Sequence, residues 1–298
     1  MPVPALLALA ACLAGVSCAM PSESQVMTWP DLLERPQPAP DQLIAYGPGE
    51  LQFSELWRPA GAGPHPTVLM IHGGCWQTEI AERDIMSWIA ADLRGRGIAV
   101  WNVEYRGVDR GGGYPETYRD VLAAAESLRS NAARLGLIAD PVVAVGHSAG
   151  GHLALWLAAA AALPEDHPLR PASSIDIKLV LSQGGIPDLV GASGRPDHPC
   201  GADAPRAMLG GEENTTVTSA FAMTPGSAEL IMLHGADDAI SPPSYGEEFA
   251  GSMAGKGRRV TVEVIPGEGH VELIAPGTRS WARQVEIIEA AMGRSPPQ

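Results

Sequence analysis

Short apolar runs alternate with longer segments of helical pattern along most of the chain. The apolar runs comprise residues 67–71, 98–103, 141–145, 178–182, 229–233 and 260–265. The helical patterns comprise residues 117–135, 151–163, 244–254 and 278–292. Because the runs are apolar on both faces, they are typical of strands that helices cover on each side. The alternation predicts an α/β fold, with a doubly wound, mostly parallel β-sheet and helices on both faces.

Two segments depart from this alternation. Residues 30–48 are rich in proline, which favours an extended linker or a wrap over the surface. Residues 188–214 are rich in Gly, Pro and Asp and carry no periodicity, and they are long for a connection. Long loops of this kind in compact domains often act as lids or binding loops.

The N-terminal segment has the pattern of an export signal. Residues 2–20 contain no charged side chain and are rich in Ala, Leu and Val. They predict a signal peptide cleaved after Ala19, or a lipoprotein signal with Cys12 as the lipidated residue. Neither fits fully, because no Lys or Arg precedes Arg35. We expect a signal over 1–19, a Pro-rich segment over 20–50 and a catalytic domain over 51–298. The protein is then expected to be exported to the periplasm or secreted, and to be cytoplasmic only if the first segment is not a signal.

Composition limits the classes of partner. The chain has 298 residues, of which 45% are hydrophobic and 18% charged, so it can bury a sizeable core. Its net charge of -14 repels phosphate backbones, which argues against nucleic acid. Membrane contact is expected only through an N-terminal lipid anchor.

The strongest chemical signal is the sequence G-H-S-A-G at residues 146–150. It lies between an apolar run and a helical pattern, which is the strand–turn–helix context of a nucleophile elbow. In that context Ser148 is the nucleophile, and the helix N-terminus favours developing negative charge. The alternative is a serine that only caps a helix.

A second signal, H-G-G-C-W at residues 72–76, directly follows the first of these runs. Two glycines let the backbone approach a substrate oxygen closely. The N–H groups of Gly73, Gly74 and Ala149 are therefore candidates for an oxyanion hole. Trp76 either lines the substrate pocket or packs in the core.

A serine nucleophile needs a histidine base and a carboxylate that orients it. In this fold the chain order is Ser, acid, His, and Asp238 and His270 follow two late strands in that order. Asp237 is a close alternative for the acid and Asp188 a weaker one; both have alternative roles in turns or helix caps. His147 is set aside, because a residue on the elbow does not easily face the hydroxyl.

The four cysteines offer no C-x-x-C pair and no zinc spacing. Cys75 and Cys200 either form one disulfide in an oxidising compartment or stay as two buried thiols. No metal and no organic cofactor is expected, because serine acyl transfer needs neither.

These motifs resemble bacterial α/β-hydrolases of the esterase and kynurenine-formamidase-like group, which is related to the prolyl-oligopeptidase-type hydrolases. The similarity covers about residues 51–291 and includes residues 101–106, 146–156, 234–242 and 267–274. It maps the acid to Asp238, the fourth residue after His234, and H-G-G-x-W is the oxyanion motif of the formamidases. Ser241 and Val271 depart from the group's pattern, where Val and an aromatic residue are usual.

The resemblance implies a Ser-His-Asp serine hydrolase that cleaves small or medium carboxylic esters through an acyl-enzyme. The alternative is an arylformamidase acting on an N-formylkynurenine-type amide. A peptidase ranks third. A non-catalytic binding protein on the same scaffold usually lacks one of the three catalytic residues, and all three are present here.

Overall fold

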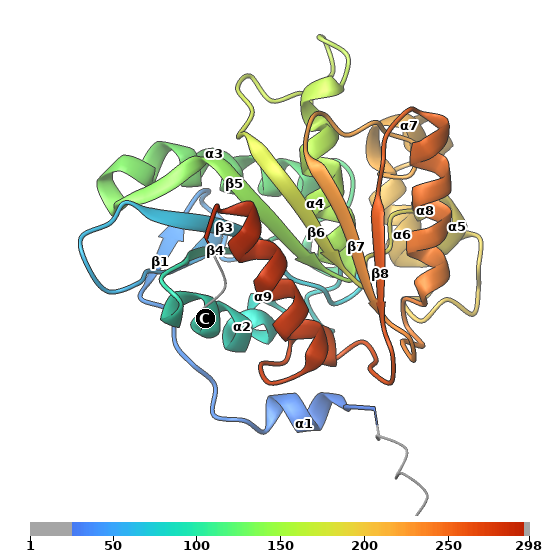
Figure 1. Ribbon diagram of the computed structural model, residues 1–298. Coiled ribbons are helices and arrows are strands. Elements are labelled where there is room, and N and C mark those ends of the chain that lie inside the picture. Colours follow the sequence, from blue (N-terminus) through green and yellow to red (C-terminus); the bar gives the residue numbers. More distant parts are fainter. Residues whose placement is uncertain (1–25, 295–298) are drawn as a thin grey trace, which may run out of the picture.

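One sheet of eight strands forms the centre of the molecule (Figure 1). The computed structural model describes residues 26–294, so the predicted signal, with Cys12 and Ala19, lies outside the described residues. The strand order is β1-β2-β4-β3-β5-β6-β7-β8. β2 is antiparallel to β1 and β4, and the other neighbouring pairs are parallel. The strands are β1 (Gln42–Ala45), β2 (Phe53–Trp57), β3 (His65–Ile71), β4 (Ala99–Val103), β5 (Leu137–His147), β6 (Ile177–Gln183), β7 (Glu229–Gly235) and β8 (Thr261–Ile265).

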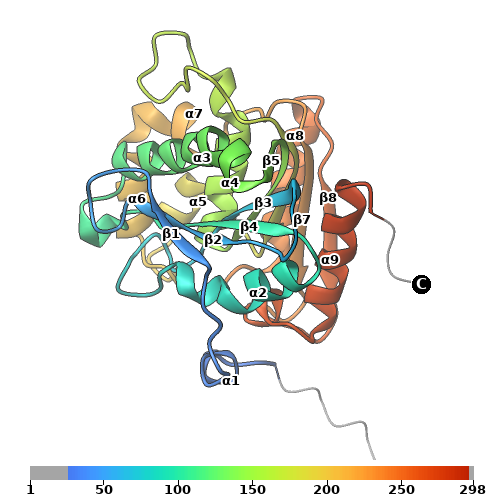
Figure 2. The same ribbon diagram turned by 90° about the vertical axis from the view of Figure 1, so that its left-hand side faces the viewer.

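Helices cover both faces of the sheet (Figure 2). One face packs against α2 (Ser87–Gly95) and α9 (Arg279–Ala291), and the other against α3 (Glu116–Leu135), α4 (Ala149–Ala159) and α8 (Pro243–Gly255). The short helices are α1 (Trp29–Leu33), α5 (Leu189–Ser193), α6 (Asp203–Leu209) and α7 (Thr215–Thr218). Single 3-10 turns are η1 (Arg83–Met86), η2 (Val108–Arg110), η3 (Ala160–Ala162), η4 (Glu212–Asn214) and η5 (Glu272–Ile274). Within residues 26–294, no helix has the length and apolar character to cross a bilayer.

The continuous apolar runs are explained by two separate cores. Along β3, Leu69 and Ile71 face the core shared with α3 and α4, whereas Val68 and Met70 face the core under α2 and α9. All four side chains are fully buried. Since successive side chains of a strand point to opposite faces, a strand between two helical layers is apolar at every position.

The predicted α/β fold class is confirmed, and all six predicted strands and four predicted helices are present within a few residues of their expected bounds. The apolar pattern did not predict β1, β2 and α2. The two strands are short, and β2 carries polar Ser54 and Glu55, which are buried but interrupt the apolar pattern.

The two irregular segments contain more structure than expected. Residues 30–48 hold part of α1 and all of β1, and Pro30 sits in the first helical turn, where proline is tolerated because its N–H would have no helical partner. β1 pairs with β2, so the sheet begins before the domain boundary predicted at residue 51. The predicted loop over residues 188–214 contains α5 and α6.

Candidate active site

Ser148 occupies a sharp turn between β5 and α4. Its backbone has φ 54° and ψ -118°, a conformation that is unfavourable for a residue with a side chain. A Cβ on Gly146 would collide with the backbone oxygen of Gly150, and one on Gly150 would collide with that of Ile71. The two glycines of G-x-S-x-G are therefore required by the packing of the turn against itself and against β3.

Replacing Gly150 by Ala is expected to lower the free energy of unfolding by more than about 2 kcal/mol, because the new methyl group meets fixed backbone. The matched control is Gly251→Ala in α8, where an added Cβ meets nothing within 4 Å and helix propensity should give a gain of up to about 1 kcal/mol. Urea unfolding of both variants measures the two effects. Equal losses in both would show that the close packing at Gly150 is unimportant.

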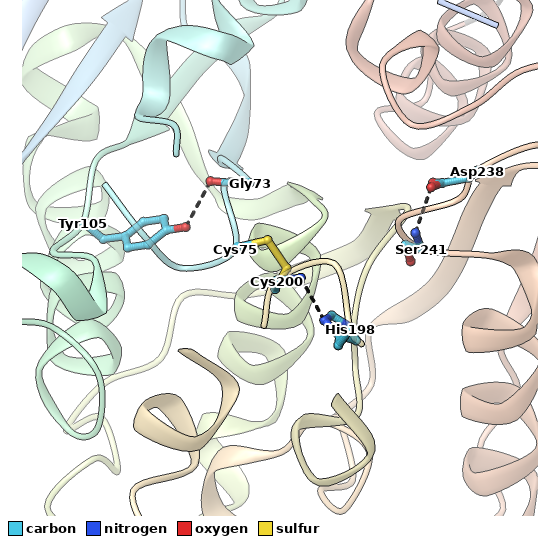
Figure 3. Close-up of a disulfide and its surroundings, with 7 residues drawn as sticks. All are labelled: Gly73, Cys75, Tyr105, His198, Cys200, Asp238 and Ser241. Carbon is cyan, nitrogen blue, oxygen red and sulfur yellow. Dashed lines mark hydrogen bonds between the residues drawn. A yellow bond between two sulfur atoms is a disulfide. The ribbon is translucent and has the colours of Figure 1, made fainter. Parts of the chain in front are cut away.

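His270 and Asp238 form a buried pair. The Nδ1 of His270 donates to Oδ2 of Asp238 at 2.7 Å, and the two residues are 6% and 3% exposed. The other carboxylate oxygen accepts the backbone N–H groups of Ile240 and Ser241, both at 2.8 Å. Figure 3 shows the bond from Ser241. With three donors around it, the carboxylate is fixed in one orientation and holds the imidazole in turn.

The two alternative acids lie elsewhere. Asp237 is exposed to solvent in the turn after β7. Asp188 is the N-cap of α5, and its side chain accepts the N–H of Val190. Both therefore have the turn or cap roles that the sequence left open for them.

Ser148 and His270 line one cavity of about 290 Å³ at the carboxyl ends of the parallel strands. The structure thus brings the predicted Ser, His and Asp residues to the same edge of the sheet, where ligands bind in open α/β folds. Most of the wall is apolar. The other lining residues are Trp29, Leu33, Gly74, Cys75, Ile80, Ala81, Ile85, His147, Pro199 and Ile240.

The loop after β3 lies against the serine. An added Cβ on Gly73 would be 3.0 Å from the Cβ of Ser148, and Gly74 has φ 99°. The single hydroxyl hydrogen of Tyr105 is shared between the backbone oxygens of His72, at 3.1 Å, and Gly73, at 3.5 Å. Figure 3 shows the contact with Gly73. With these carbonyl oxygens bound to Tyr105, the loop keeps a fixed shape beside Ser148.

Glu104 supports the same loop and received no role from sequence reasoning. Its buried carboxylate accepts from Nε2 of His72 at 2.9 Å and from the backbone N–H groups of Arg83 and Tyr105. Burial raises the pKa of Glu104, but the charge of His72 and these hydrogen bonds outweigh it, so the pKa lies below its ordinary value. The one available signal was a charged residue directly after an apolar strand.

A disulfide joins this loop to the segment between α5 and α6. Cys75 and Cys200 are linked, with an S–S distance of 1.99 Å and a sequence separation of 125 (Figure 3). Cys75 and Pro199 both line the cavity. The bond therefore fixes two walls of the cavity to each other.

Reduction of this disulfide is expected to lower the free energy of unfolding by about 2–4 kcal/mol, because the unfolded chain gains conformational freedom. Unfolding with and without dithiothreitol measures the loss, and intact mass reports the bond. The double variant C75S/C200S is the control and should not respond to reductant. Equal sensitivity of the double variant and the wild type would contradict the assignment.

His147 differs from expectation, and Trp76 takes one of the two roles expected for it. His147 does reach the cavity, where its ring lies 4.4 Å from that of His270 and its Nε2 donates to the His270 backbone oxygen at 3.2 Å. Burial and the nearby His270 hold the pKa of His147 well below its ordinary value. Trp76, by contrast, is fully buried, packs edge-on against His152 and is not among the lining residues. Of its two proposed roles, core packing is the observed one.

His152, one turn into α4, gives a pH-dependent contribution to stability. Burial lowers its pKa from 6.5 to about 4, so at pH values between these two the unfolded chain binds a proton that the folded protein does not bind. This contribution is complete above pH 6.5 and is lost as the pH falls toward 4; the loss amounts to about 2 kcal/mol at pH 5. Urea unfolding at pH 7.5 and 5 should show a smaller difference for His152→Gln, which keeps a donor for the Thr218 oxygen. An unchanged difference would contradict this assignment.

The fold and the arrangement of the site define the class of protein. The sheet is mostly parallel, and β5 ends in a strained turn that contains the serine. A buried His–Asp pair lies at the same edge of the sheet. This is the architecture of the α/β-hydrolases. A family model described as BD-FAE matches residues 55–253, more than half of the chain. The chain therefore belongs to the BD-FAE family, an α/β-hydrolase-type esterase family, and is an enzyme of the serine carboxylic ester hydrolases.

Solved structures of esterases share the fold. A truncated carbohydrate esterase from gut microbiota is 18% identical, with a TM-score of 0.68 over 85% of this chain and 95% of that one. A butyrate-bound thermophilic esterase from Thermogutta terrifontis is 22% identical, with a TM-score of 0.68 over 86% and 96%. Esterase B from Lactobacillus rhamnosis is 18% identical, with a TM-score of 0.71 over 87% and 88%. Among curated proteins there is no match. The predicted esterase resemblance is confirmed, and its formamidase part stays a prediction.

No group of three or more His, Cys, Asp or Glu side chains in residues 26–294 is arranged to hold a metal ion.

Proposed function

We propose that this enzyme hydrolyses carboxylic esters through an acyl-enzyme, with Ser148 as nucleophile, His270 as general base and Asp238 as its orienting carboxylate. The observation that carries the proposal is the 2.7 Å hydrogen bond from His270 Nδ1 to buried Asp238, at the edge where Ser148 lines the cavity. Because Nδ1 keeps its proton in that bond, Nε2 of the neutral ring is free to accept one.

Acylation begins when the Ser148 oxygen attacks the ester carbonyl carbon and His270 takes its proton. Negative charge then develops on the carbonyl oxygen, and the N–H groups of Gly73, Gly74 and Ala149 are the proposed donors to it. The position of Gly73 against Ser148 and that of Ala149 in the first turn of α4 support this choice. His270 next protonates the departing alcohol, and a water that it activates releases the acid from Ser148.

The size and the apolar lining of the cavity favour esters with small, apolar groups. Its volume of about 290 Å³ lies at the lower end of the range for ligand pockets. Apart from His147, Ser148 and His270, every lining residue carries an apolar or no side chain or is the disulfide-bonded Cys75. Short-chain acyl esters are therefore the proposed substrates.

A fluorophosphonate probe should label the wild-type enzyme, and Ser148→Ala should abolish labelling. The same change should lower kcat on an aryl acetate at least about 1000-fold, because the covalent route is lost. The matched control is Ser193→Ala, which alters a serine on α5 away from the cavity and should leave both readouts intact. Equal labelling of the wild type and Ser148→Ala would show that the nucleophile is misassigned.

Formamide hydrolysis is the second candidate, because H-G-G-C-W at residues 72–76 matches the oxyanion motif of the formamidases. The values of kcat/KM for phenyl acetate and N-formylkynurenine decide between them. We expect the ester to be preferred. A clear preference for the formamide would overturn the ester assignment while leaving the acyl-enzyme mechanism in place.

We also propose that the enzyme acts outside the cytoplasm, in the periplasm or secreted. The disulfide between Cys75 and Cys200 supports this, because such bonds persist in oxidising compartments. Cell fractionation with intact mass of the recovered protein tests it, since export with cleavage would remove the residues up to Ala19. Full-length protein confined to the cytoplasm would contradict the proposal.

A further inference from the structure

The residues before β1 lie at the catalytic cavity. α1 and the chain that follows it precede the residues matched by the family model, which begin at 55. Figure 1 shows α1 as a separate short helix beside the ends of α2 and α9. Two of its side chains, Trp29 and Leu33, line the same cavity as Ser148 and His270. This wall therefore lies outside the part of the chain that the family model matches.

The orientation of α1 follows from its own sequence. Residues four apart lie on the same face of a helix, so Trp29 and Leu33 point together toward the cavity. Leu32 lies next to Trp29 on the helix surface, and its side chain is fully buried in the core that contains α2 and α9. The helix is thus fixed by one apolar residue in the core and presents two others to the substrate.

Trp29 also contacts the proposed base. The centroid of its ring lies 6.4 Å from that of His270 and 6.3 Å from that of His147, and both contacts are edge-on. Leu33 lies further out and is 51% exposed, which is the position of a rim residue. One side chain therefore covers the imidazoles, and the other narrows the entrance.

Hydrogen bonds fix this segment on both sides of α1. Before the helix, the buried carboxylate of Glu272 accepts the N–H of Met27 and, with its other oxygen, the N–H of Gly269. After it, Arg35 donates to the Pro276 oxygen at 3.0 Å. Both anchors lie in the chain around His270, so the wall and the base are held by the same loop.

We propose that Trp29 and Leu33 determine substrate specificity, by closing the cavity to esters with long apolar groups. This rests on the ester hydrolase function proposed above. With the wall in place the cavity holds about 290 Å³, and each truncation to Ala removes apolar atoms that bound this space. The enlarged cavity can then hold longer acyl or alkyl groups that do not fit in the wild-type enzyme.

The test compares long and short esters on both sides of the bond. The acyl pair is p-nitrophenyl octanoate and acetate, and the alkyl pair is octyl and ethyl acetate. For Leu33→Ala and Trp29→Ala, we expect the long-to-short ratio of kcat/KM to rise at least 5-fold in one pair. Trp29→Phe, which keeps an aromatic wall, should stay nearer the wild-type ratio.

The matched control is Leu43→Ala. Leu43 is another exposed leucine of the N-terminal part, 58% exposed on β1, and it does not line the cavity. Its ratios should stay within 2-fold of the wild type. Because Leu33 is half exposed, Leu33→Ala should fold even if Trp29→Ala does not, and a thermal melt of each variant checks this.

Active-site titration with the fluorophosphonate distinguishes failure of the specificity proposal from failure of the ester hydrolase function on which it rests. A wild-type enzyme that neither labels nor hydrolyses any ester would remove the proposed function itself. If all variants label and hydrolyse, but neither ratio moves more than 2-fold in Leu33→Ala and Trp29→Ala, the specificity proposal is wrong and the ester hydrolase stands. A change of equal size in Leu43→Ala would also overturn it.

Discussion

The site depends on the close approach of two backbones, the first turn of α4 and the end of β3. Only glycine at position 150 lets the helix start against the Ile71 oxygen, and this contact holds Ser148 in its unfavourable conformation. The cost of that conformation, of order 1–3 kcal/mol, is offset by α4 itself, almost every residue of which is buried. The loops after β7 and β8 reach the same place because parallel strands end at one edge.

Sequence reasoning succeeded where a physical requirement is local. A strand buried on both faces must be apolar throughout, and the strained turn at Ser148 needs small residues two positions before and after the serine. Both requirements can be read within a short window of the chain. Choosing between Asp237 and Asp238 is different, because adjacent residues of one turn share their local sequence and differ only in which one the fold buries.

What the sequence could not predict depends on contacts between distant segments. α1 has five residues, too few for any periodicity, and its proline-rich surroundings are typical of a linker; its position comes from Leu32 in a core made by residues far along the chain. His147 was set aside as a neighbour of the nucleophile, but the turn brings its ring beside His270. Trp76 has an apolar side chain that suits a cavity or a core equally well, and only its neighbours decide.

The bond between Cys75 and Cys200 also changes the topology of the molecule. It closes residues 75–200 into a covalent ring that includes β4, β5, α4 and β6, and therefore the serine turn. A single cut by a protease in the connection after η3, where residues 164–174 are largely exposed, would leave both pieces joined. Such a nicked enzyme would migrate as one chain until it is reduced, and the two pieces would stay held together around the serine.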